Sequence, residues 1–537
     1  MSNTLSIEHL TIGLPEGADR PFAVEDVSMA IEKGEILCVV GESGSGKSMT
    51  ANALMGLLPP GVNVKAGRAM FEARDVLRLP ESEKQALRGA SMAMIFQEPM
   101  TALNPLMRIG DQIVEVFAAH DLYTQSERRE KALALIREVQ LPDPEKIIRA
   151  YPFQLSGGQR QRAMIAMALA LEPKLLVADE PTTALDVTTQ AQILKLILDL
   201  RKKRGMAVMF ITHDFGVVAE IADQVIVMRM GKVVERGSAT EVLEQPQHDY
   251  TKRLLEAIPT GKLPEARKLS ETPALEIRGL RKIYRTGGGM FKPVREVRAV
   301  DDVSLTVARG EVLGLVGESG SGKSTLGRTA VRLVTPDGGK VMVGGTDLAA
   351  LSDEELRKQR HKVQMVFQDP YASLNPRQRI MGAITDGPIT RGIPRKEAEA
   401  RARELLEIVG LGADAASRFP HEFSGGQRQR IGIARALAMD PELIIADEAV
   451  SALDVSIQAQ VLDLLRELRE KLELSILFIT HDLRVAAQLC DRIAVMQKGK
   501  LVEIGTVHDI FLNPQQDYTR KLLAAVPGAD WDRQGAA

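Results

Sequence analysis

One eight-residue pattern, rich in glycine and ending in lysine and serine, occurs twice in the chain and could bind phosphate. Gly-Glu-Ser-Gly-Ser-Gly-Lys-Ser occupies residues 41–48 and again residues 317–324. Its glycines allow the backbone to curl so that successive N–H groups point at an anion. The lysine supplies a positive charge for the β- and γ-phosphates of a nucleotide, and the serine offers a hydroxyl to Mg²⁺. Chance would produce the pattern about 0.03 times in such a chain, so two occurrences predict two nucleotide sites. The predicted phosphate-binding residues are Gly41, Glu42, Ser43, Gly44, Ser45, Gly46, Lys47 and Ser48, and then Gly317, Glu318, Ser319, Gly320, Ser321, Gly322, Lys323, Ser324 and Thr325.

A second repeated feature is an acidic pair at the end of an apolar run. Asp179 and Glu180 end one run, and Asp447 and Glu448 end its counterpart. An aspartate at a strand end can hold Mg²⁺ through water, and the glutamate beside it can polarise an attacking water. Most Asp-Glu pairs are solvated loop charges, but a position behind an apolar strand and downstream of a phosphate loop favours catalysis. We therefore predict that the aspartates bind Mg²⁺ and that the glutamates are catalytic.

The chain consists of two copies of one domain. The phosphate-loop pattern repeats 276 residues later, whereas the patterns Ser-Gly-Gly-Gln-Arg-Gln-Arg, Asp-Glu and Thr-His-Asp all repeat 268 residues later. The spacing changes only between Lys47 and Ser156, which indicates a change in loop length. Each copy ends in Pro-Gln-x-Asp-Tyr-Thr-x-x-Leu-Leu-x-Ala-x-Pro, at 246–259 and 514–527. The predicted domains are 1–260 and 274–537, joined by a linker over 261–273.

Apolar runs predict the strands that must position these residues. Ile36–Val40 and Val312–Val316 lead into the two phosphate loops, and His213 and His481 each follow a further apolar run. Buried strands that end in polar groups, with helical segments between them, predict an α/β fold with a mostly parallel core sheet. Ligands of such sheets bind at the carboxyl ends of the strands, so the nucleotide sites are expected there.

A helical insertion is predicted between the middle strands of each copy. Thr124 and Glu127 have the spacing of a capping box ahead of a helical stretch that continues to Val139. Its counterpart over 394–409 begins with proline and is stopped by Gly410.

The composition is that of a soluble globular protein and excludes several other classes. Hydrophobic residues make up 45% and charged residues 26%, and the net charge of −2 gives no global reason to expect nucleic acid binding. Two cysteines, Cys38 and Cys490, exclude a disulfide framework, a four-cysteine metal site and an iron–sulfur cluster. We expect no secretory signal and no membrane-spanning segment, because no run of about 18 apolar residues occurs.

The segments Leu-Ser-Gly-Gly-Gln at 155–159 and Phe-Ser-Gly-Gly-Gln at 423–427 resemble the signature sequence of ABC ATPases. A serine at this position can cap a helix, and the N-terminus of that helix favours a phosphate. The resemblance implies tandem ABC-type P-loop NTPase domains, each with an additional antiparallel β subdomain. It also implies a head-to-tail arrangement, in which each signature faces the ATP bound to the other copy. The signature residues expected to contact ATP are Ser156, Gly158, Ser424 and Gly426.

Further positions match functional residues of that family. Gln97 and Gln368 match the Q-loop glutamine, which reaches Mg²⁺ and the water and moves with a membrane partner. His213 and His481 match the switch histidine that contacts the γ-phosphate, and we expect them to take part in catalysis. The resemblance thus implies Mg²⁺ sites formed by Ser48, Gln97 and Asp179, and by Ser324, Gln368 and Asp447.

One match differs between the copies. Tyr284 takes the place of the aromatic residue that stacks on adenine, whereas the first copy has Leu14 there, with Phe22 as an alternative aromatic. Weaker ATP binding at the first site is therefore expected.

The segments 184–186 and 452–454 match the D-loop, which crosses the interface between ATPase domains. Both signatures and both glutamates are present, so both sites are predicted to hydrolyse ATP.

The cargo is suggested by two further resemblances. The segments 96–105 and 367–376, and the tails at 249–255 and 517–523, resemble the subfamily that drives dipeptide, oligopeptide and nickel uptake. The fused form resembles that of some peptide, glutathione and microcin-type importers. These resemblances imply an ATPase that uses ATP and Mg²⁺ to drive peptide import at the cytoplasmic face of the inner membrane. The implied partners are two membrane-spanning permease subunits and an extracytoplasmic solute-binding protein.

Other readings remain open at this point. A nickel or glutathione importer fits the same motifs, because ABC ATPases do not touch their cargo. A soluble tandem ATPase acting on ribosomes usually has a long charged helical linker, and the connection here is short. Excision-repair relatives need zinc-binding cysteines, and an exporter is not expected to have these tails.

Overall fold

The first half of the chain forms two sheets because its apolar residues follow two patterns. The computed structural model describes residues 3–183, 185–258, 263, 267–286, 295–369, 373–451 and 453–527. Burial roughly alternates along β1 (Asn3–Gly13), whereas every residue of β3 (Ile36–Val40) and β8 (Ala207–Thr212) is buried. Alternation is typical of antiparallel strands with one solvated face, and continuous burial is typical of parallel strands covered on both faces.

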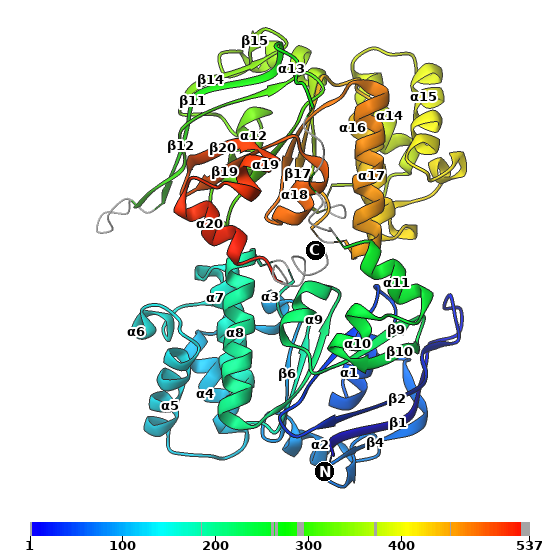
Figure 1. The fold of residues 1–537 in the computed structure, drawn as a ribbon, viewed down its shortest axis with the longest axis vertical. Coiled ribbons are helices and arrows are strands. Elements are labelled where there is room, and N and C mark those ends of the chain that lie inside the picture. Colours follow the sequence, from blue (N-terminus) through cyan, green and yellow to red (C-terminus); the bar gives the residue numbers. More distant parts are fainter. Residues whose placement is uncertain are drawn as a thin grey trace. The chain divides into compact units, whose positions relative to one another are not determined.

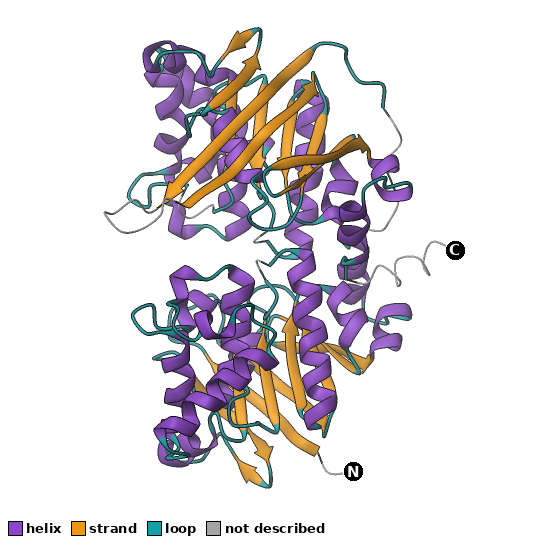
Figure 2. Ribbon diagram, turned by 90° about the vertical axis from the view of Figure 1, so that its left-hand side faces the viewer, coloured by secondary structure: helices purple, strands orange, loops and turns teal. Residues whose placement is uncertain are grey.

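The chain divides into two units, which contain corresponding strands in the same order and a similar series of helices (Figures 1 and 2). The first unit comprises Met1–Leu185 and Thr189–Ile258, and the second comprises Asp186–Thr188 and Pro259–Ala537. The elements of the first half are β1, β2 (Phe22–Glu32), β3, α1 (Lys47–Met55), β4 (Asn63–Phe71), β5 (Arg74–Asp75), α2 (Glu81–Leu87), β6 (Met92–Ile95), α3 (Pro99–Ala102), α4 (Ile109–Ala119), α5 (Gln125–Glu138), α6 (Pro144–Ile147), η1 (Pro152–Gln154), α7 (Gly157–Ala168), β7 (Leu175–Asp179), α8 (Val187–Arg204), β8, α9 (Phe215–Ile221), β9 (Gln224–Arg229), β10 (Lys232–Ser238), α10 (Ala239–Glu244) and α11 (Asp249–Glu256). Those of the second half are β11 (Pro273–Thr286), β12 (Arg295–Ala308), β13 (Val312–Val316), α12 (Lys323–Ala330), β14 (Gly338–Val343), β15 (Thr346–Asp347), α13 (Asp353–Gln359), η2 (Arg360–Lys362), β16 (Val363–Val366), α14 (Ile380–Thr390), α15 (Arg395–Ile408), η3 (Ala413–Ser417), η4 (Pro420–Glu422), α16 (Gly425–Leu437), β17 (Leu443–Asp447), α17 (Val455–Leu472), β18 (Ser475–Ile479), α18 (Leu483–Leu489), β19 (Arg492–Gln497), β20 (Lys500–Thr506), α19 (Val507–Leu512) and α20 (Asp517–Ala524).

The sheet order is the same in both units and agrees with the predicted fold class. A six-stranded sheet has the order β10-β9-β3-β8-β7-β6 in the first unit and β20-β19-β13-β18-β17-β16 in the second. Only its edge strand, β10 or β20, is antiparallel to its neighbour. An antiparallel four-stranded sheet has the order β2-β1-β4-β5 or β12-β11-β14-β15. The parallel core sheet and the antiparallel β subdomain are therefore confirmed.

Parallel pairing brings the carboxyl ends of three strands to one edge of the core sheet. In the first unit, β8 lies between β3 and β7, with Val40 paired to Thr212 and Asp179 paired to Ile211. The phosphate loop follows β3, the acidic pair closes β7, and His213 follows β8 directly. The strand order thus places the predicted chemistry at neighbouring positions.

The predicted helical insertions are also confirmed. The side chain of Thr124 accepts a hydrogen bond from the Glu127 N–H, and the Glu127 carboxylate accepts from the Thr124 N–H at 2.7 Å, so α5 begins with a capping box. In the second unit, α15 follows Pro394 and ends before Gly410, which has a φ of 74°.

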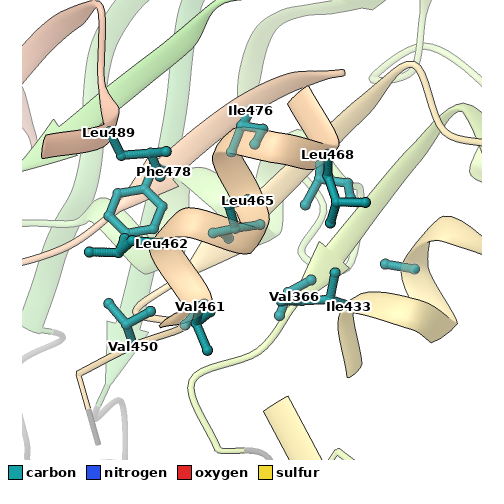
Figure 3. Close-up of a cluster of buried hydrophobic side chains, with 14 of the residues drawn as sticks. Val366, Ile433, Val450, Val461, Leu462, Leu465, Leu468, Ile476, Phe478 and Leu489 are labelled. Atoms are coloured by element: carbon teal, nitrogen blue, oxygen red, sulfur yellow. The ribbon is translucent and has the colours of Figure 1, made fainter. Parts of the chain in front are cut away.

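A long helix packs on one face of the core sheet in the second unit. In the second unit, α17 directs the buried residues Val461, Leu462, Leu465 and Leu468 at a hydrophobic cluster that includes residues of β18 (Figure 3). Their spacing of one, three and three residues follows one face of a helix. Replacing a buried leucine here by alanine is expected to cost about 2–5 kcal/mol. The described helices include none that is both long and apolar enough to cross a membrane.

The two cores differ at one packed position. β3 carries the fully buried Cys38 at the point where β13 carries Gly314. A Cβ on Gly314 would lie 2.9 Å from the sulfur of Cys490, which follows α18. The residue that follows α9 in the first unit is Ala222. The cysteine therefore lies on the strand in the first core and after the helix in the second, and the equivalent positions carry the smaller Gly314 and Ala222.

Candidate active site

The phosphate loop requires glycine at both of its ends. Gly41 and Gly46 have φ values of 148° and 101° in the turn between β3 and α1. A Cβ on Gly41 would lie 2.2 Å from the carbonyl oxygen of Met228, and one on Gly46 would lie 2.7 Å from that of Ala23. The corresponding glycines of the second unit have φ values of 151° and 105°. Other predicted loop residues lie in the same turns, namely Glu42, Ser43, Gly44 and Ser45, and Glu318, Ser319, Gly320 and Ser321, while Thr325 lies in the first turn of α12.

The loop lysine is buried among backbone carbonyls. Lys47 is 5% exposed, and its Nζ donates hydrogen bonds to the carbonyl oxygens of Gly41, at 2.6 Å, and Glu42, at 3.0 Å. Lys323 makes the same two contacts in its loop at 2.7 and 2.9 Å. Burial lowers the pKa of Lys323, while the charge of Glu448 opposes that shift. A poorly solvated ammonium at the mouth of a glycine-rich loop is suited to an anion.

A serine and an aspartate form a pair of oxygen ligands beside each lysine. The Ser48 hydroxyl donates to Asp179 Oδ1 at 2.9 Å, and the Ser324 hydroxyl donates to Asp447 Oδ1 at 2.8 Å. Burial raises the pKa of Asp179 to about 6; the charge of Glu180 adds to this, and the Ser48 hydrogen bond opposes it. Hydroxyl and carboxylate oxygens are the donors that Mg²⁺ prefers, and a cation would offset the poor solvation of the carboxylate. These residues therefore fit the predicted metal.

Three side chains hold Glu180 in a strained position. Gln97 Nε2 donates to its carboxylate at 2.8 Å, the Thr183 hydroxyl donates at 3.0 Å, and His213 Nδ1 lies 3.4 Å away. Glu180 itself has a φ of 46°, in the left-handed region that non-glycine residues rarely adopt. Such strain is often found at functional sites, where the surrounding contacts maintain it.

The second unit repeats this arrangement around Glu448. Glu448 has a φ of 48°, accepts from Gln368 Nε2 at 2.7 Å and lies 3.7 Å from His481 Nδ1. The predicted glutamine, glutamate and histidine are therefore brought together in both units.

The surroundings of Glu180 keep its carboxylate ionised. Burial alone would raise its pKa, but the hydrogen bond and charge of His213, together with Lys47, lower it to about 2. Glu448 follows the same pattern, with its pKa lowered by His481 and Lys323 against the effect of burial. An ionised carboxylate at a fixed position can orient and polarise a water molecule.

The signature residues lie at helix N-termini, as predicted. Ser156 caps α7 through a hydrogen bond from the Gln159 N–H, and Ser424 caps α16 in the same way. Gly158 has a further role that sequence reasoning missed, because a Cβ there would lie 2.4 Å from Thr189 Cγ2 of α8. The corresponding distance at Gly426 is 2.2 Å. Glycine therefore permits the close packing of two helices at this position.

The signature helix stands apart from the phosphate loop of its own unit. In Figure 1, α7 and α1 lie toward opposite sides of the first unit, and α16 and α12 do so in the second. The site residues that each unit assembles by itself are therefore the phosphate loop, the acidic pair, the glutamine and the histidine.

The sheet register establishes the counterpart of Tyr284. Ile12 pairs with Val24 as Lys282 pairs with Val300, so Leu14 corresponds to Tyr284. Phe22, the alternative aromatic, lies on the neighbouring strand and pairs with Gly13, the residue before Leu14. Tyr284 is 40% exposed, as a stacking surface would be.

Of the D-loop segments, residues 184 and 452 lie outside the described part of the chain, as do residues 370–372 of the segment 367–376.

Two tyrosines that the sequence did not predict as site residues contact the phosphate loops. The hydroxyl of Tyr250 in α11 contacts Glu42 of the first phosphate loop, and that of Tyr518 in α20 contacts Glu318 of the second. Both tyrosines belong to the repeated tails, and their matching positions in the two copies were the only sign in the sequence that they have a role.

A 570 Å³ cavity adjoins Gln368 in the second unit and is lined in part by Arg328, Arg360 and Arg435.

Two family models match this chain. The family described as ABC transporter matches residues 24–183 and 300–451. The family described as oligopeptide/dipeptide transporter, C-terminal region, matches 234–285 and 502–536. A solved dimeric ATP-binding cassette in a post-hydrolysis state, bound to ADP and phosphate, covers 43% of this chain with 98% of its own, at 30% identity and a TM-score of 0.40.

Two curated relatives match over nearly the whole length. The peptidoglycan transport ATP-binding protein YejF of Agrobacterium fabrum is 47% identical over 525 residues, which are 97% of this chain and 96% of that protein. The glutathione import ATP-binding protein GsiA of Escherichia coli K12 is 47% identical over 565 residues, with 99% of this chain and 91% of that protein covered. The chain therefore belongs to the ATP-binding proteins of ABC transporters, with two ATPase domains that are each followed by the C-terminal region of oligopeptide and dipeptide transporters.

Proposed function

We propose that this chain hydrolyses ATP to drive an importer for peptides or related peptide-containing solutes. The observation that carries the proposal occurs in both units: an ionised glutamate beside a phosphate loop, held by a glutamine and a histidine. The match of both tails to oligopeptide and dipeptide transporters supports import as the process that is driven. The two relatives are named for peptidoglycan transport and glutathione import, and both compounds contain peptide bonds. Glutathione is therefore the second candidate for the cargo.

The proposed chemistry relies on positioning and charge. In the first unit, Glu180 polarises the attacking water, while Lys47 and the loop N–H groups stabilise the charge on the transferred phosphoryl group. Mg²⁺ held by Ser48, Asp179 and Gln97 would neutralise charge on the β- and γ-phosphates. His213 keeps Glu180 charged and in place, and is expected to contact the γ-phosphate. The second unit uses its corresponding residues in the same way.

We also propose that each ATP site is completed by the signature of the other half. Ser424 and Gly426 then serve the site of Lys47, and Ser156 and Gly158 serve the site of Lys323. A helix N-terminus capped by serine, with glycine beside it, is suited to a phosphate. Closing and reopening of the two halves around ATP would be the force-generating step.

Double substitutions test this pairing of sites. Lys47→Ala with Ser424→Ala removes two groups from one composite site, so the activity should resemble that of Lys47→Ala alone. Lys47→Ala with Ser156→Ala damages both sites, so the activity should fall well below that of either single variant. The opposite ranking in an ATPase assay would contradict the composite arrangement.

The proposed location and partners follow from the function. The chain would act at the cytoplasmic face of the inner membrane with two membrane-spanning permease subunits and an extracytoplasmic solute-binding protein. The cavity beside Gln368 is a suitable place for a cytoplasmic segment of a permease, because movement there reaches Glu448 through one hydrogen bond.

Uptake by cells tests the function as a whole. Deletion of the gene should reduce uptake of a labelled tripeptide, and wild type should restore it, whereas Glu180→Gln with Glu448→Gln should not. Unchanged tripeptide uptake, in cells that lack other peptide importers, would contradict peptides as the cargo, and labelled glutathione and nickel would then be tested. Purification of the chain with ribosomes instead of membranes would contradict the importer proposal.

A further inference from the structure

The C-terminal tail of each domain reaches back to the phosphate loop. In the first unit, the hydroxyl of Tyr250 accepts a hydrogen bond from the Glu42 N–H at 3.2 Å and donates one to the Glu42 carboxylate at 3.1 Å. Tyr250 is 4% exposed, although it belongs to a short helix near the end of the domain. One hydroxyl therefore binds the backbone and the side chain of a single loop residue.

The surroundings fix the position of the tyrosine ring. The carboxylate of Glu235 accepts hydrogen bonds from the N–H groups of Gln247 and His248, at 2.6 and 3.1 Å, and so anchors the chain just before α11. The guanidinium of Arg229 lies 5.0 Å from the centre of the Tyr250 ring, within the range of a cation–π contact. Arg229 of β9 thus contacts the ring, and Glu235 of β10 anchors the chain before the helix that carries it; both strands belong to the core sheet.

The second unit contains the backbone part of this connection. The hydroxyl of Tyr518 accepts a hydrogen bond from the Glu318 N–H at 3.2 Å. Glu503 anchors the tail there as well, accepting from the N–H groups of Gln515 and Gln516 at 2.7 and 3.2 Å and from the Thr519 hydroxyl. The contact is therefore kept in both units, although the residue before the tyrosine-bearing helix is histidine in one and glutamine in the other.

The glutamate that each tyrosine holds also holds the loop lysine. The carbonyl oxygen of Glu42 accepts from Lys47 Nζ at 3.0 Å, and that of Glu318 accepts from Lys323 Nζ at 2.9 Å. A rotation of this glutamate would displace the lysine from the turn in which phosphates are expected. A short chain of contacts thus runs from the tail through the glutamate to the ammonium group.

We propose that Tyr250 and Tyr518 are positioning residues that hold the phosphate loop and its lysine ready for ATP, so that the tail contributes to nucleotide affinity. The proposal rests on the proposed ATPase function for the identity of the nucleotide. The tyrosines do not touch the reacting atoms. They reduce the cost of ordering the loop when ATP binds, so their loss should weaken ATP binding and leave the chemical step unchanged.

The test uses substitutions that remove only the hydroxyl. Tyr250→Phe, Tyr518→Phe and the double variant keep the ring, and Tyr123→Phe in the helical insertion is the matched control. Because one or two hydrogen bonds are lost per site, the KM for ATP of the double variant should rise about 3- to 10-fold, with kcat within about 2-fold of wild type. The unfolding temperature should change little, and Tyr123→Phe should change none of these quantities.

A binding experiment separates this proposal from the proposed function. The tyrosine substitutions would also be placed in the Glu180→Gln plus Glu448→Gln background, and the Kd for ATP would be measured by calorimetry. A 3- to 10-fold higher Kd supports the proposal even when wild type shows no ATPase activity, a result that would count against the proposed function alone. An unchanged KM and Kd with a lower unfolding temperature would show a purely structural tail. A lower kcat at unchanged KM would equally overturn the proposal.

Discussion

Replacing Asp179 by asparagine should stabilise the first domain while abolishing its ATPase activity. Asp179 is 6% exposed, and burial raises its pKa from 3.8 to about 6. The folded protein therefore binds this proton more tightly than the unfolded chain does. Stability is lost as the pH rises from about 4 to about 6, and the charged form carries the full penalty above pH 6. With 1.36 kcal/mol for each pKa unit, that penalty is about 3 kcal/mol at pH 8 and roughly half as large at pH 5.

Asparagine removes the charge but keeps an oxygen that can accept the Ser48 hydrogen bond. For a domain of this size, about 3 kcal/mol corresponds to a rise in unfolding temperature of about 6–12 °C, which is an upper limit. Scanning calorimetry at pH 8 and pH 5, without Mg²⁺ or nucleotide, measures this rise. Asp199→Asn on the exposed face of α8 is the matched control and should stay within about 0.5 kcal/mol of wild type. An unchanged or lower unfolding temperature at pH 8, or a gain that does not shrink at pH 5, would refute the reasoning.

Three further outcomes are expected. Glu180→Gln with Glu448→Gln should lower kcat at least 100-fold while ATP binding is retained. An ATPase assay and an equilibrium binding measurement check the two quantities, and turnover at the wild-type rate would contradict a catalytic role for the glutamates. Leu14→Tyr should tighten ATP binding at the first site by about 2- to 10-fold, as measured by calorimetry, and no gain would contradict adenine stacking there. Gly158→Ala should destabilise the fold by about 1–3 kcal/mol, and adding Thr189→Ser, which removes the methyl group in contact, should recover part of that loss in denaturant unfolding. Equal stability of the single and double variants would show that the contact with Thr189 is unimportant.

Much of the site was predictable because local patterns determine it. The strands before the phosphate loops begin and end at the predicted residues, since an apolar run of five residues, interrupted in β13 only by Gly314, is followed by glycine in both units. The apolar run ahead of the first acidic pair forms β7 (Leu175–Asp179), which includes Asp179 but ends before Glu180. Parallel pairing then explains why polar groups that are far apart in sequence meet at one edge of the sheet.

What could not be predicted depends on contacts between distant segments. The carboxylate of Glu180, whose backbone is left-handed, is held by Gln97 and His213, which follow two other strands of the sheet. The need for a small residue at Gly158 arises from the approach of α8, which no local pattern reveals. The contact between Tyr250 and Glu42 joins residues 208 positions apart, so the tail could be identified as a family feature without its structural role being visible.

The exchange of small and large residues between the two cores has a consequence for how such a repeated gene can change. In the second core Cys490 lies against Gly314, and in the first core the residue types are exchanged, with Cys38 on the strand and Ala222 after the helix. A hybrid domain that combines the first strand of one copy with the later helix of the other would place two cysteines together or leave a hole. Recombination at the connection between domains keeps the two residues of each core together, whereas a crossover between the strand and the later helix separates them. The two copies are consequently free to diverge, each as an inherited whole.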